Sequence, residues 1–588
     1  MYKHLIWTLF LVTSSGLLSC SEDFLTKQPP GVAAGSVIES PEGIEAILIG
    51  TYASIRGTSI FGGAMGTDWT YGSAYSDDCH YGNSAGNAWD LMDKYDMRVA
   101  YPGFPDRWRI CYEGVSRANS VLEFLIKTQE GNRPIPIARA IQIEAEAKFL
   151  RAWFHFQANK VFEYIPYIKT KAELAPTLPE NVLNSDHGWD GIEEDLQFAI
   201  DNLPVTHPLG EVGRPVKFAS EAVKAQAHMY QKEFGEAKKL LDDIISNGGF
   251  ELVSNFYDNY DMTHENNIES IFEIQAATIT SKHSSVSPAG AVFHQMGPAS
   301  LGGWGFFNPT QVLFEAFQVD SDGLPVLNIS DREPLANDQG LSSKAEFIPT
   351  DHLLDLRVDW TIARRGIDYL GWGIHPGEAW MREQNINGPY MTKKYMHFKS
   401  EQILNNYGTG FYNGKNYRLY RLAHIILWRA EVAVEEGDLE YARILVNKIR
   451  NRAKYSNPVM GLCETYSNLE TNPQVDWSQP AANYKVEPYP PGHSSFSDIE
   501  EARKAVRMEI RLEFATEGHR FFDLRRWGLD NLLLNDFIQR DQKMTNYMKG
   551  TIYDPEEDDY WPLPPDQVEF QKEILKQDSS YLNYSYPY

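Results

Sequence analysis

The stretch Glu501–Gly528 reads EARKAVRMEIRLEFATEGHRFFDLRRWG, and it decides the fold of this chain. At 100° per residue its charges fall into two stripes. One stripe consists of Arg503, Arg507 and Arg511, and the other consists of Glu509, Glu513 and Glu517. No face is free of apolar residues, whereas a solvated surface helix keeps one polar face. We therefore predict a helix that is packed on two sides, with its charges paired to other elements of the protein.

The boundaries of this helix also follow from the sequence. Ser497 and Glu500 form a capping-box pattern that predicts its start, and Gly518 predicts a sharp turn. After the turn, four charged residues alternate with Phe, Leu and Trp in the segment HRFFDLRRWG. We interpret this segment as a structural network of ion pairs in preference to a ligand-binding site.

The block resembles the signature of the SusD/RagB family, the surface lipoproteins that accompany TonB-dependent nutrient transporters. The matching positions are Arg511, Glu513, Glu517, Gly518, Arg520, Phe521, Asp523, Leu524, Arg526, Trp527 and Gly528. The resemblance implies a mainly α fold, a tetratricopeptide-like helical frame with long irregular inserted loops and little β structure. It also implies ligand binding without catalysis, beside a SusC-like TonB-dependent barrel as partner.

The N-terminus agrees with this resemblance independently. An apolar run too short to span a bilayer ends in Leu17-Leu18-Ser19-Cys20, which resembles a bacterial lipobox. We therefore expect a signal peptide over residues 1–19, a lipid on Cys20 and a tether over 20–40. The expected location is the outer membrane, with the chain lipid-anchored at the cell surface. The alternative is an ordinary signal peptide in which a Cys stands at this position by chance.

The composition of the chain narrows the range of ligand classes. The 588 residues carry 54 basic and 80 acidic side chains, a formal charge of −26, which disfavours nucleic acid as a partner. It also disfavours polyanionic ligands unless the charge is reversed locally. Aromatic residues make up 13% of the chain, with 14 Trp, and their flat apolar faces suit sugar rings. Apart from Cys20, three cysteines remain without a CxxC pattern, and we expect Cys79, Cys111 and Cys463 to be buried free thiols.

Helical spacing dominates both halves of the chain. Helices are predicted over Asp106–Lys127 and Ile141–Phe162, with a further one around Ile192–Leu203. Glu221–Ile245 and Leu427–Ile449 both resemble tetratricopeptide helix pairs. In these pairs small residues twelve apart allow close helix packing, namely Ala225 with Ala237 and Ala430 with Ala442.

Between these repeats the sequence changes character. The ranges 68–90, 283–312 and 366–416 are rich in Gly, aromatic residues and Asn, and 467–495 is rich in Pro. Within a SusD-like domain over 41–588 we therefore expect a helical frame at about 41–255 and 417–530. Loop-rich ligand-binding insertions are expected at about 256–416 and 454–496, because long ordered loops on a rigid frame commonly carry binding sites.

The candidate ligand residues come from three aromatic clusters. The clusters are Trp69, Tyr71, Tyr75, Tyr81 and Trp89; Trp304, Phe306 and Phe307; and Trp372, His375 and Trp380. We expect two or three of these residues to line one exposed platform. The candidate glycan-binding set is Trp89, Trp304, Asp77, Asn83, Tyr81, Trp372 and Trp380, with Trp89 and Trp304 leading.

Catalytic and metal-binding patterns are weak. Gly82-Asn83-Ser84-Ala85-Gly86 satisfies G-x-S-x-G but follows polar residues instead of a buried strand. Asp77-Asp78 are adjacent, which does not suit a glycosidase pair facing one bond from both sides. Asp320-Ser321-Asp322-Gly323 and the acidic run 556–559 leave a structural calcium open. No cofactor is expected otherwise.

The interpretation that fits best is a cell-surface glycan-binding lipoprotein that delivers oligosaccharide to its barrel partner. The main alternative is peptide capture, as in the RagB branch, where extended peptides are held through their backbones. A lipoprotein glycoside hydrolase would need two carboxylates about 5–10 Å apart in a cleft. A pure tetratricopeptide scaffold would not need three aromatic clusters in its loops.

Overall fold

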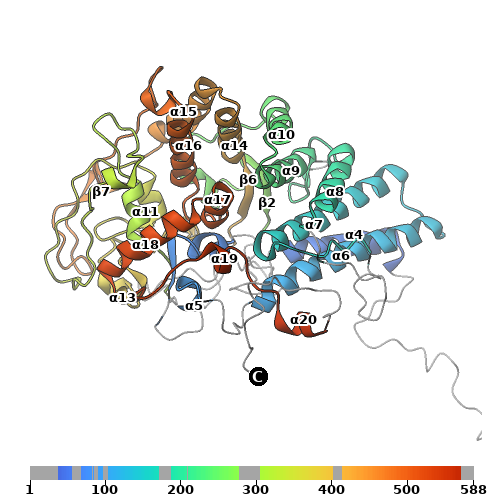
Figure 1. The fold of residues 1–588 in the computed structure, drawn as a ribbon, viewed down its shortest axis with the longest axis horizontal. Coiled ribbons are helices and arrows are strands. Elements are labelled where there is room, and N and C mark those ends of the chain that lie inside the picture. Colours follow the sequence, from blue (N-terminus) through green and yellow to red (C-terminus); the bar gives the residue numbers. More distant parts are fainter. Residues whose placement is uncertain are drawn as a thin grey trace, which may run out of the picture.

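The fold is known from a computed structural model, which describes residues 38–55, 68–82, 84, 90–96, 104–170, 184, 187–207, 210–276, 305–401 and 414–570. The longer helices line up as successive neighbours along one side of the molecule (Figure 1). They are α4 (Pro41–Ile55), α6 (Phe104–Glu130), α7 (Ile137–Phe162), α8 (Trp189–Asn202), α9 (Lys217–Gln231), α10 (Phe234–Asn247), α14 (Leu422–Glu435), α15 (Leu439–Tyr455) and α16 (Ile499–Phe514). The chain is thus mainly α, as predicted.

The helical frame continues across the long insertion in the middle of the chain. Helix α10 packs against α14, although about 175 residues of sequence separate them. Each pair, α9 with α10 and α14 with α15, packs as an antiparallel-type unit joined by a short turn. The alanines that predicted these contacts are completely buried, namely Ala225, Ala237, Ala430 and Ala442. The prediction of two tetratricopeptide-like pairs is therefore confirmed.

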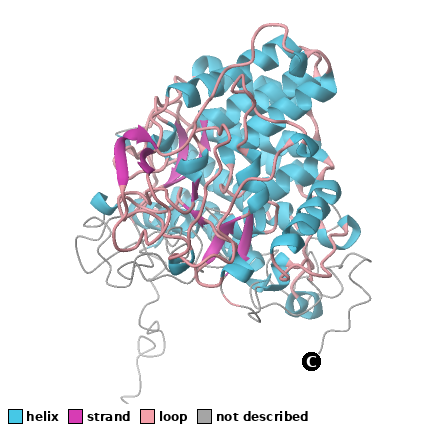
Figure 2. Ribbon diagram, turned by 90° about the vertical axis from the view of Figure 1, so that its left-hand side faces the viewer, coloured by secondary structure: helices cyan, strands magenta, loops and turns pink. Residues whose placement is uncertain are grey.

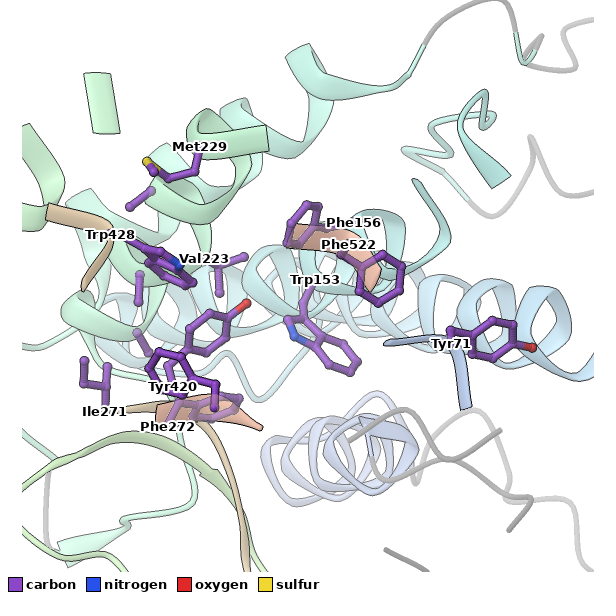
Figure 3. Close-up of a cluster of buried hydrophobic side chains, with 14 of the residues drawn as sticks. Tyr71, Trp153, Phe156, Val223, Met229, Ile271, Phe272, Tyr420, Trp428 and Phe522 are labelled. Carbon is purple, nitrogen blue, oxygen red and sulfur yellow. The ribbon is translucent and has the colours of Figure 1, made fainter. Parts of the chain in front are cut away.

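The core of the frame is aromatic as well as aliphatic (Figure 3). Trp153 and Phe156 on α7 face Met229 on α9 and Trp428 on α14, with Phe272 beneath them. All of these side chains are buried. Side chains of this size each bury 150–250 Å², so they dominate the stability of the frame.

The strands are short and occur in four antiparallel pairs among the described residues. The pairs are β1 (Cys79–Gly82) with β3 (Phe306–Pro309), β2 (Ser270–Ile274) with β6 (Tyr417–Arg421), β4 (Ile362–Ala363) with β5 (Met391–Thr392), and β7 (Met460–Cys463) with β8 (Val475–Pro480). Figure 2 shows these strands, and the pair β2 with β6 packs against helices α9 and α14 of the frame. Register partners such as Ser270 and Arg421 tie the first part of the insertion to the start of α14.

Short helices and the C-terminal segment complete the loop side. The short helices are α5 (Asp90–Asp93), α11 (Gln311–Ala316), α12 (Val358–Thr361), α13 (Gln384–Asn387), α19 (Pro555–Asp558) and α20 (Pro565–Phe570). Helix α17 (Arg520–Trp527) and helix α18 (Asp530–Met544) follow α16 and lead from the frame to the loop side (Figure 1). Cys79, Cys111 and Cys463 are buried free thiols, as predicted. Within the ranges given above, no helix is long and apolar enough to cross a bilayer.

The signature segment forms two helices instead of one bent helix. Helix α16 ends at Phe514 and α17 begins at Arg520, with Gly518 between them at φ +79°. The predicted capping box is wrong by one residue, because Asp498 is the N-cap and its side chain accepts a hydrogen bond from the Glu501 amide. Aspartate is as good an N-cap as serine, so the sequence signal was ambiguous at this position.

The acidic stripe of α16 is the hub of a buried ion-pair network, as the sequence predicted. Glu513 is completely buried and pairs with Arg357, Arg421 and Arg452. Arg357 Nη1 lies 3.0 Å from Glu513 Oε2, and Arg421 Nη1 lies 2.6 Å from Glu513 Oε1. Burial raises the pKa of Glu513, but these guanidiniums outweigh burial and hold the pKa well below its usual value.

The arginines around Glu513 come from different parts of the chain. Arg357 belongs to the insertion, Arg421 starts α14 and Arg452 lies on α15. The hub therefore fixes the inserted loops to the frame through charges that water does not reach. A buried pair of this kind is costly to break, because each partner left alone is an uncompensated buried charge.

The basic stripe of α16 holds the loop 68–82 in the same way. Asp77 pairs with Arg511 at 2.9 Å and with Arg520 at 2.7 Å. In the same loop, Gly72 lies so close to Gly518 that a Cβ on Gly72 would be 1.8 Å from the Gly518 carbonyl oxygen. Only glycine fits at Gly72, and the close contact seats the loop on the turn between α16 and α17.

Candidate functional site

A groove of about 510 Å³ opens where the two predicted insertions meet, and we call it the aromatic groove. Its aromatic lining consists of Tyr257, Trp360, Phe398 and Trp477, and its remaining lining includes Asn255, Asp258, Asp261, Asp368, Leu370, Lys393, Asn457 and Met460. Most small-molecule sites fall between 300 and 1,000 Å³ and combine aromatic walls with a few polar groups. The groove has both properties.

The inner wall of the groove is a fixed stack of rings. Trp360 stacks on Tyr257 with 4.7 Å between ring centroids and 29° between ring planes. Phe398 meets Tyr257 edge-on at 5.4 Å. Trp360 Nε1 donates to the Asn457 carbonyl at 2.8 Å, and the Tyr257 hydroxyl donates to the Lys393 carbonyl at 3.0 Å. Both polar edges are therefore satisfied by the backbone, which leaves the ring faces for apolar contact.

Trp477 forms the outer wall and is 58% exposed. It stands on β8, whose partner β7 carries Gly461 at φ +105°. A Cβ on Gly461 would lie 2.8 Å from the Trp477 ring, so the indole rests directly on the glycine backbone. The hairpin thus presents a large aromatic face to solvent in a supported position.

The floor of the groove carries one buried cation, Lys393. Its Nζ donates to the Asp359 carbonyl at 2.6 Å and lies 5.8 Å from the centroid of Trp360. Burial lowers the pKa of Lys393 to about 8, against the opposing charges of Asp368 and Asp359. At neutral pH the ammonium is a charged hydrogen-bond donor at the base of an aromatic wall.

Carboxylates on the rim offer hydrogen-bond acceptors. Asp368 accepts a hydrogen bond from the Gly371 amide at 2.8 Å, and Asp258 lies next to Asn255 at 3.4 Å. Asp261 accepts from the Thr263 and His264 amides in a local turn. Together with the asparagines, these groups supply donors and acceptors that match the hydroxyls of a sugar.

Two of the sequence candidates lie behind this groove. Trp372 and Trp380 belong to the same hydrophobic cluster as Tyr257 and Trp360. Trp372 is buried and donates from Nε1 to the His397 carbonyl at 3.1 Å, while Trp380 is half-buried against His375. They support the wall, whereas the rings that line the groove, Trp360 and Trp477, were missed from the sequence because each stands alone in a segment without other aromatic residues.

The first two aromatic clusters do not form an exposed platform in the described part of the chain, which corrects that expectation. Trp69 packs 4.9 Å from Tyr81 and 5.4 Å from Phe307, and Tyr81 packs 5.3 Å from Phe306. All four rings are buried. The pairing of β1 with β3 joins the two clusters, and their rings belong to the main hydrophobic core, so aromatic residues that looked like loop surface serve packing instead.

Asp77 is also removed from the set of ligand contacts. It is 1% exposed. Burial raises the pKa of Asp77, but the charges of Arg511 and Arg520 outweigh burial and lower this pKa to about 2. Its carboxylate is committed to the ion pairs that seat the loop on α16. Tyr81 is fully buried and shares this structural role.

Four of the sequence candidates, Cys20, Asn83, Trp89 and Trp304, lie outside the described residues. Gly82, which precedes Asn83, and Gly305, which follows Trp304, are both described. These two glycines touch, since a Cβ on Gly82 would lie 2.5 Å from the Gly305 carbonyl oxygen. The predicted calcium is likewise untested; Asp320 accepts hydrogen bonds from the Asp322 and Leu324 amides.

Comparison with known proteins agrees with the sequence resemblance. The profile of the SusD family matches residues 268–581, and a profile described as "Starch-binding associating with outer membrane" matches residues 23–229. SusD-like protein P25 of Formosa agariphila is 24% identical over 543 residues, which covers 90% of each chain.

Solved structures share the fold over nearly the whole length. A SusD-like carbohydrate-binding protein of Bacteroides fragilis has a TM-score of 0.67 at 20% identity, covering 92% of this chain and 100% of that one. Surface glycan-binding protein A of Bacteroides thetaiotaomicron, solved in complex with laminarihexaose, has a TM-score of 0.63 at 18% identity and covers 92% and 99%. Since the SusD profile alone matches more than half of the sequence, this chain belongs to the SusD family.

Proposed function

We propose that this protein captures oligosaccharide at the outer cell surface and delivers it to a SusC-like TonB-dependent barrel. The observation that carries the proposal is the aromatic groove between the two insertions, with Trp360 and Trp477 as its two walls. Its mechanism is binding, with no bond made or broken. The glycan complex of a relative with the same fold supports this direction.

The chemistry of the groove favours sugar rings as ligand. A pyranose has apolar C–H faces and a rim of hydroxyls, which matches ring faces on the walls and polar groups on the floor and rim. Stacking on Trp477 is expected to contribute about 1–2 kcal/mol, by analogy with aromatic pairs. Asp368 and Asn457, which are not buried, are placed to accept from and donate to hydroxyls in the same groove.

A second binding position is proposed from the sequence alone, at Trp89 and Trp304 with Asn83 beside them. Alanine variants separate this position from the aromatic groove, because Trp477→Ala removes one wall of the groove and Trp304→Ala removes a ring outside the described residues.

Titration calorimetry against a panel of neutral oligosaccharides tests the proposal. The wild type is expected to bind at least one member, and Trp477→Ala to weaken that binding about tenfold, since 1.4 kcal/mol is one decade of affinity. Trp477→Phe is the matched control and should keep most of the affinity. Binding of extended peptides in place of every glycan would support the peptide alternative and contradict our proposal.

Delivery depends on anchoring, for which we propose the lipid on Cys20. Each buried CH₂ of an acyl chain contributes about 0.8 kcal/mol to membrane attachment. Cys20→Ala should yield an unacylated protein that leaves the membrane fraction. Continued palmitate labelling and outer-membrane fractionation of the variant would contradict the anchor, without bearing on the groove.

A further inference from the structure

A second pocket, of about 470 Å³, lies between α11, residues 332–337 and α18. Helices α11 and α18 contact each other at this place on the loop side of the molecule (Figure 1). Phe537, Leu335 and Met544 give the pocket apolar walls, and Arg332, Arg540 and Lys543 bring three cations to its lining. None of these residues lines the aromatic groove.

Arg332 is the unusual member of this lining. It is buried, with 9% of its surface exposed. Its Nε donates to the Val326 carbonyl at 3.2 Å, whereas Nη2 makes only long contacts, 3.5 Å to the Leu327 carbonyl and 3.9 Å to Met508 Sδ. Nη1 has no hydrogen-bond partner among the described residues, and this atom is accessible to solvent. This donor therefore remains for a group that enters the pocket.

Other buried arginines show how unusual this is. In the described ranges, every buried arginine except Arg332 and Arg365 lies within 4.0 Å of a carboxylate oxygen. Arg365 is satisfied in another way, because it donates to four backbone carbonyls at 2.5 to 3.2 Å. Arg332 has neither arrangement, and a buried charge without a partner is costly.

The acidic residues of the pocket do not neutralise Arg332. Glu315 and Asp536 both pair with Arg540, at 3.5 Å and 2.8 Å. Asp541 pairs with His80 at 3.0 Å. Lys543 is exposed and, like Arg332, has no ion pair within the described residues. Two cations thus remain unmatched.

The electrostatic surroundings act in the same direction. Burial, followed by the positive charges of Arg511, Arg520 and Arg540, lowers the pKa of Arg332 to about 9, with Asp77 opposing them. Binding of an anion therefore stabilises this guanidinium more than it would stabilise a guanidinium that already pairs with a carboxylate. Its planar fork matches a carboxylate with two parallel hydrogen bonds.

We propose that the pocket around Arg332 binds the carboxylate of an acidic sugar, a uronic acid, with Phe537, Leu335 and Met544 against the apolar side of the ring. This inference rests on the proposed function, since it takes the ligand to be a saccharide. It means that the protein, despite its charge of −26, selects glycans that carry uronic acid residues. The positive charge needed for such a ligand is supplied locally.

Ligand-induced thermal shift with small probes tests the pocket directly, because a ligand that binds only the folded state raises the melting temperature. Glucuronate is expected to raise the melting temperature of the wild type, and glucose at the same concentration is not. Arg332→Met, which keeps the length of the side chain without its charge, should weaken glucuronate at least tenfold. Lys543→Gln, at an exposed position, should weaken it two- to threefold.

Two further measurements make the result decisive. Trp477→Ala should keep its full response to glucuronate, so loss of neutral oligosaccharide binding in that variant bears only on the aromatic groove. Arg332→Met should melt no lower than the wild type, because it breaks no ion pair. The proposal is overturned if glucose or inorganic sulfate matches glucuronate, if Arg332→Met still responds, or if the wild type shows no shift.

Discussion

Helix α16 and the aromatic groove differ in the exposure of their most prominent side chains. At α16, Glu513 and its three arginines are buried and paired, and they join the insertion to the frame. At the groove, Trp477 is 58% exposed and supported from behind by Gly461. The segment with the strongest sequence motif thus serves the scaffold, whereas a residue on strand β8, outside the motif, forms the wall of the proposed binding site. The contrast shows that burial, more than residue type, separates structural from functional roles here.

The largest expected effect comes from breaking the hub. Glu513→Ala leaves Arg357, Arg421 and Arg452 facing each other without their shared carboxylate, and such losses cost about 3–5 kcal/mol of unfolding free energy. Chemical denaturation measures it. Glu500→Ala is the matched control, because Glu500 pairs only with Arg503 at the surface and should change stability by less than 1 kcal/mol. Equal losses in both variants would contradict the role of the hub.

Overpacking of the frame is expected to have an intermediate effect. Ala430 is completely buried where α14 packs within the frame, so Ala430→Leu should cost about 1–3 kcal/mol of stability. Glycan affinity of the folded fraction should stay unchanged, because the groove is built from other segments. A thermal melt together with calorimetry below the melting temperature checks both. A large loss of affinity at full stability would show that the frame shapes the groove directly.

Removal of the groove wall is expected to change binding but not folding. Trp477→Ala exposes little new apolar surface, so its unfolding free energy should fall by less than 1 kcal/mol while the affinity for glycan falls about tenfold. Differential scanning calorimetry and titration calorimetry on the same sample provide both values. A stability loss as large as that of Glu513→Ala would place Trp477 with the scaffold.

The smallest expected effect is a pH dependence in the groove. The pKa of Lys393 is lowered to about 8, so its ammonium loses its proton between pH 7 and pH 9, and its contacts with the Asp359 carbonyl and the Trp360 ring, which hold the groove wall in place, become weaker. Affinity should therefore fall about threefold over this range. Since the folded-state pKa lies below the unfolded value, this lysine should not lower stability as pH rises through 8.

The matched variant for this prediction is Lys393→Met, in which the pH dependence should disappear. Titration calorimetry at pH 7 and pH 9 measures it for both proteins. An identical pH profile in the variant would show that another group causes the dependence.

Local patterns in the sequence predicted the frame well. The helical period, the paired alanines and the charged stripes of α16 are all local, and the structure confirms the elements that they indicate. The start of α16 was missed by one residue because Ser497 and Asp498 are both good N-caps.

The groove was not predictable in the same way. Trp360 and Trp477 come together only because the two insertions meet, and this contact is distant in sequence. Conversely, the richest aromatic run, around Trp69, forms a core because β1 pairs with β3. The number of aromatic residues in a segment does not predict whether they line a groove or are buried in the core, because their burial depends on which strand pairs with that segment.

A crystal structure of the protein with a bound neutral oligosaccharide tests the central claim most directly. Our account predicts sugar rings in the aromatic groove, with one ring face on Trp477 and a hydroxyl within hydrogen-bond distance of the Asp368 carboxylate. The ion pairs around Glu513 should be unchanged. An oligosaccharide bound elsewhere while the groove stays free of ligand would contradict the assignment of this groove as the capture site.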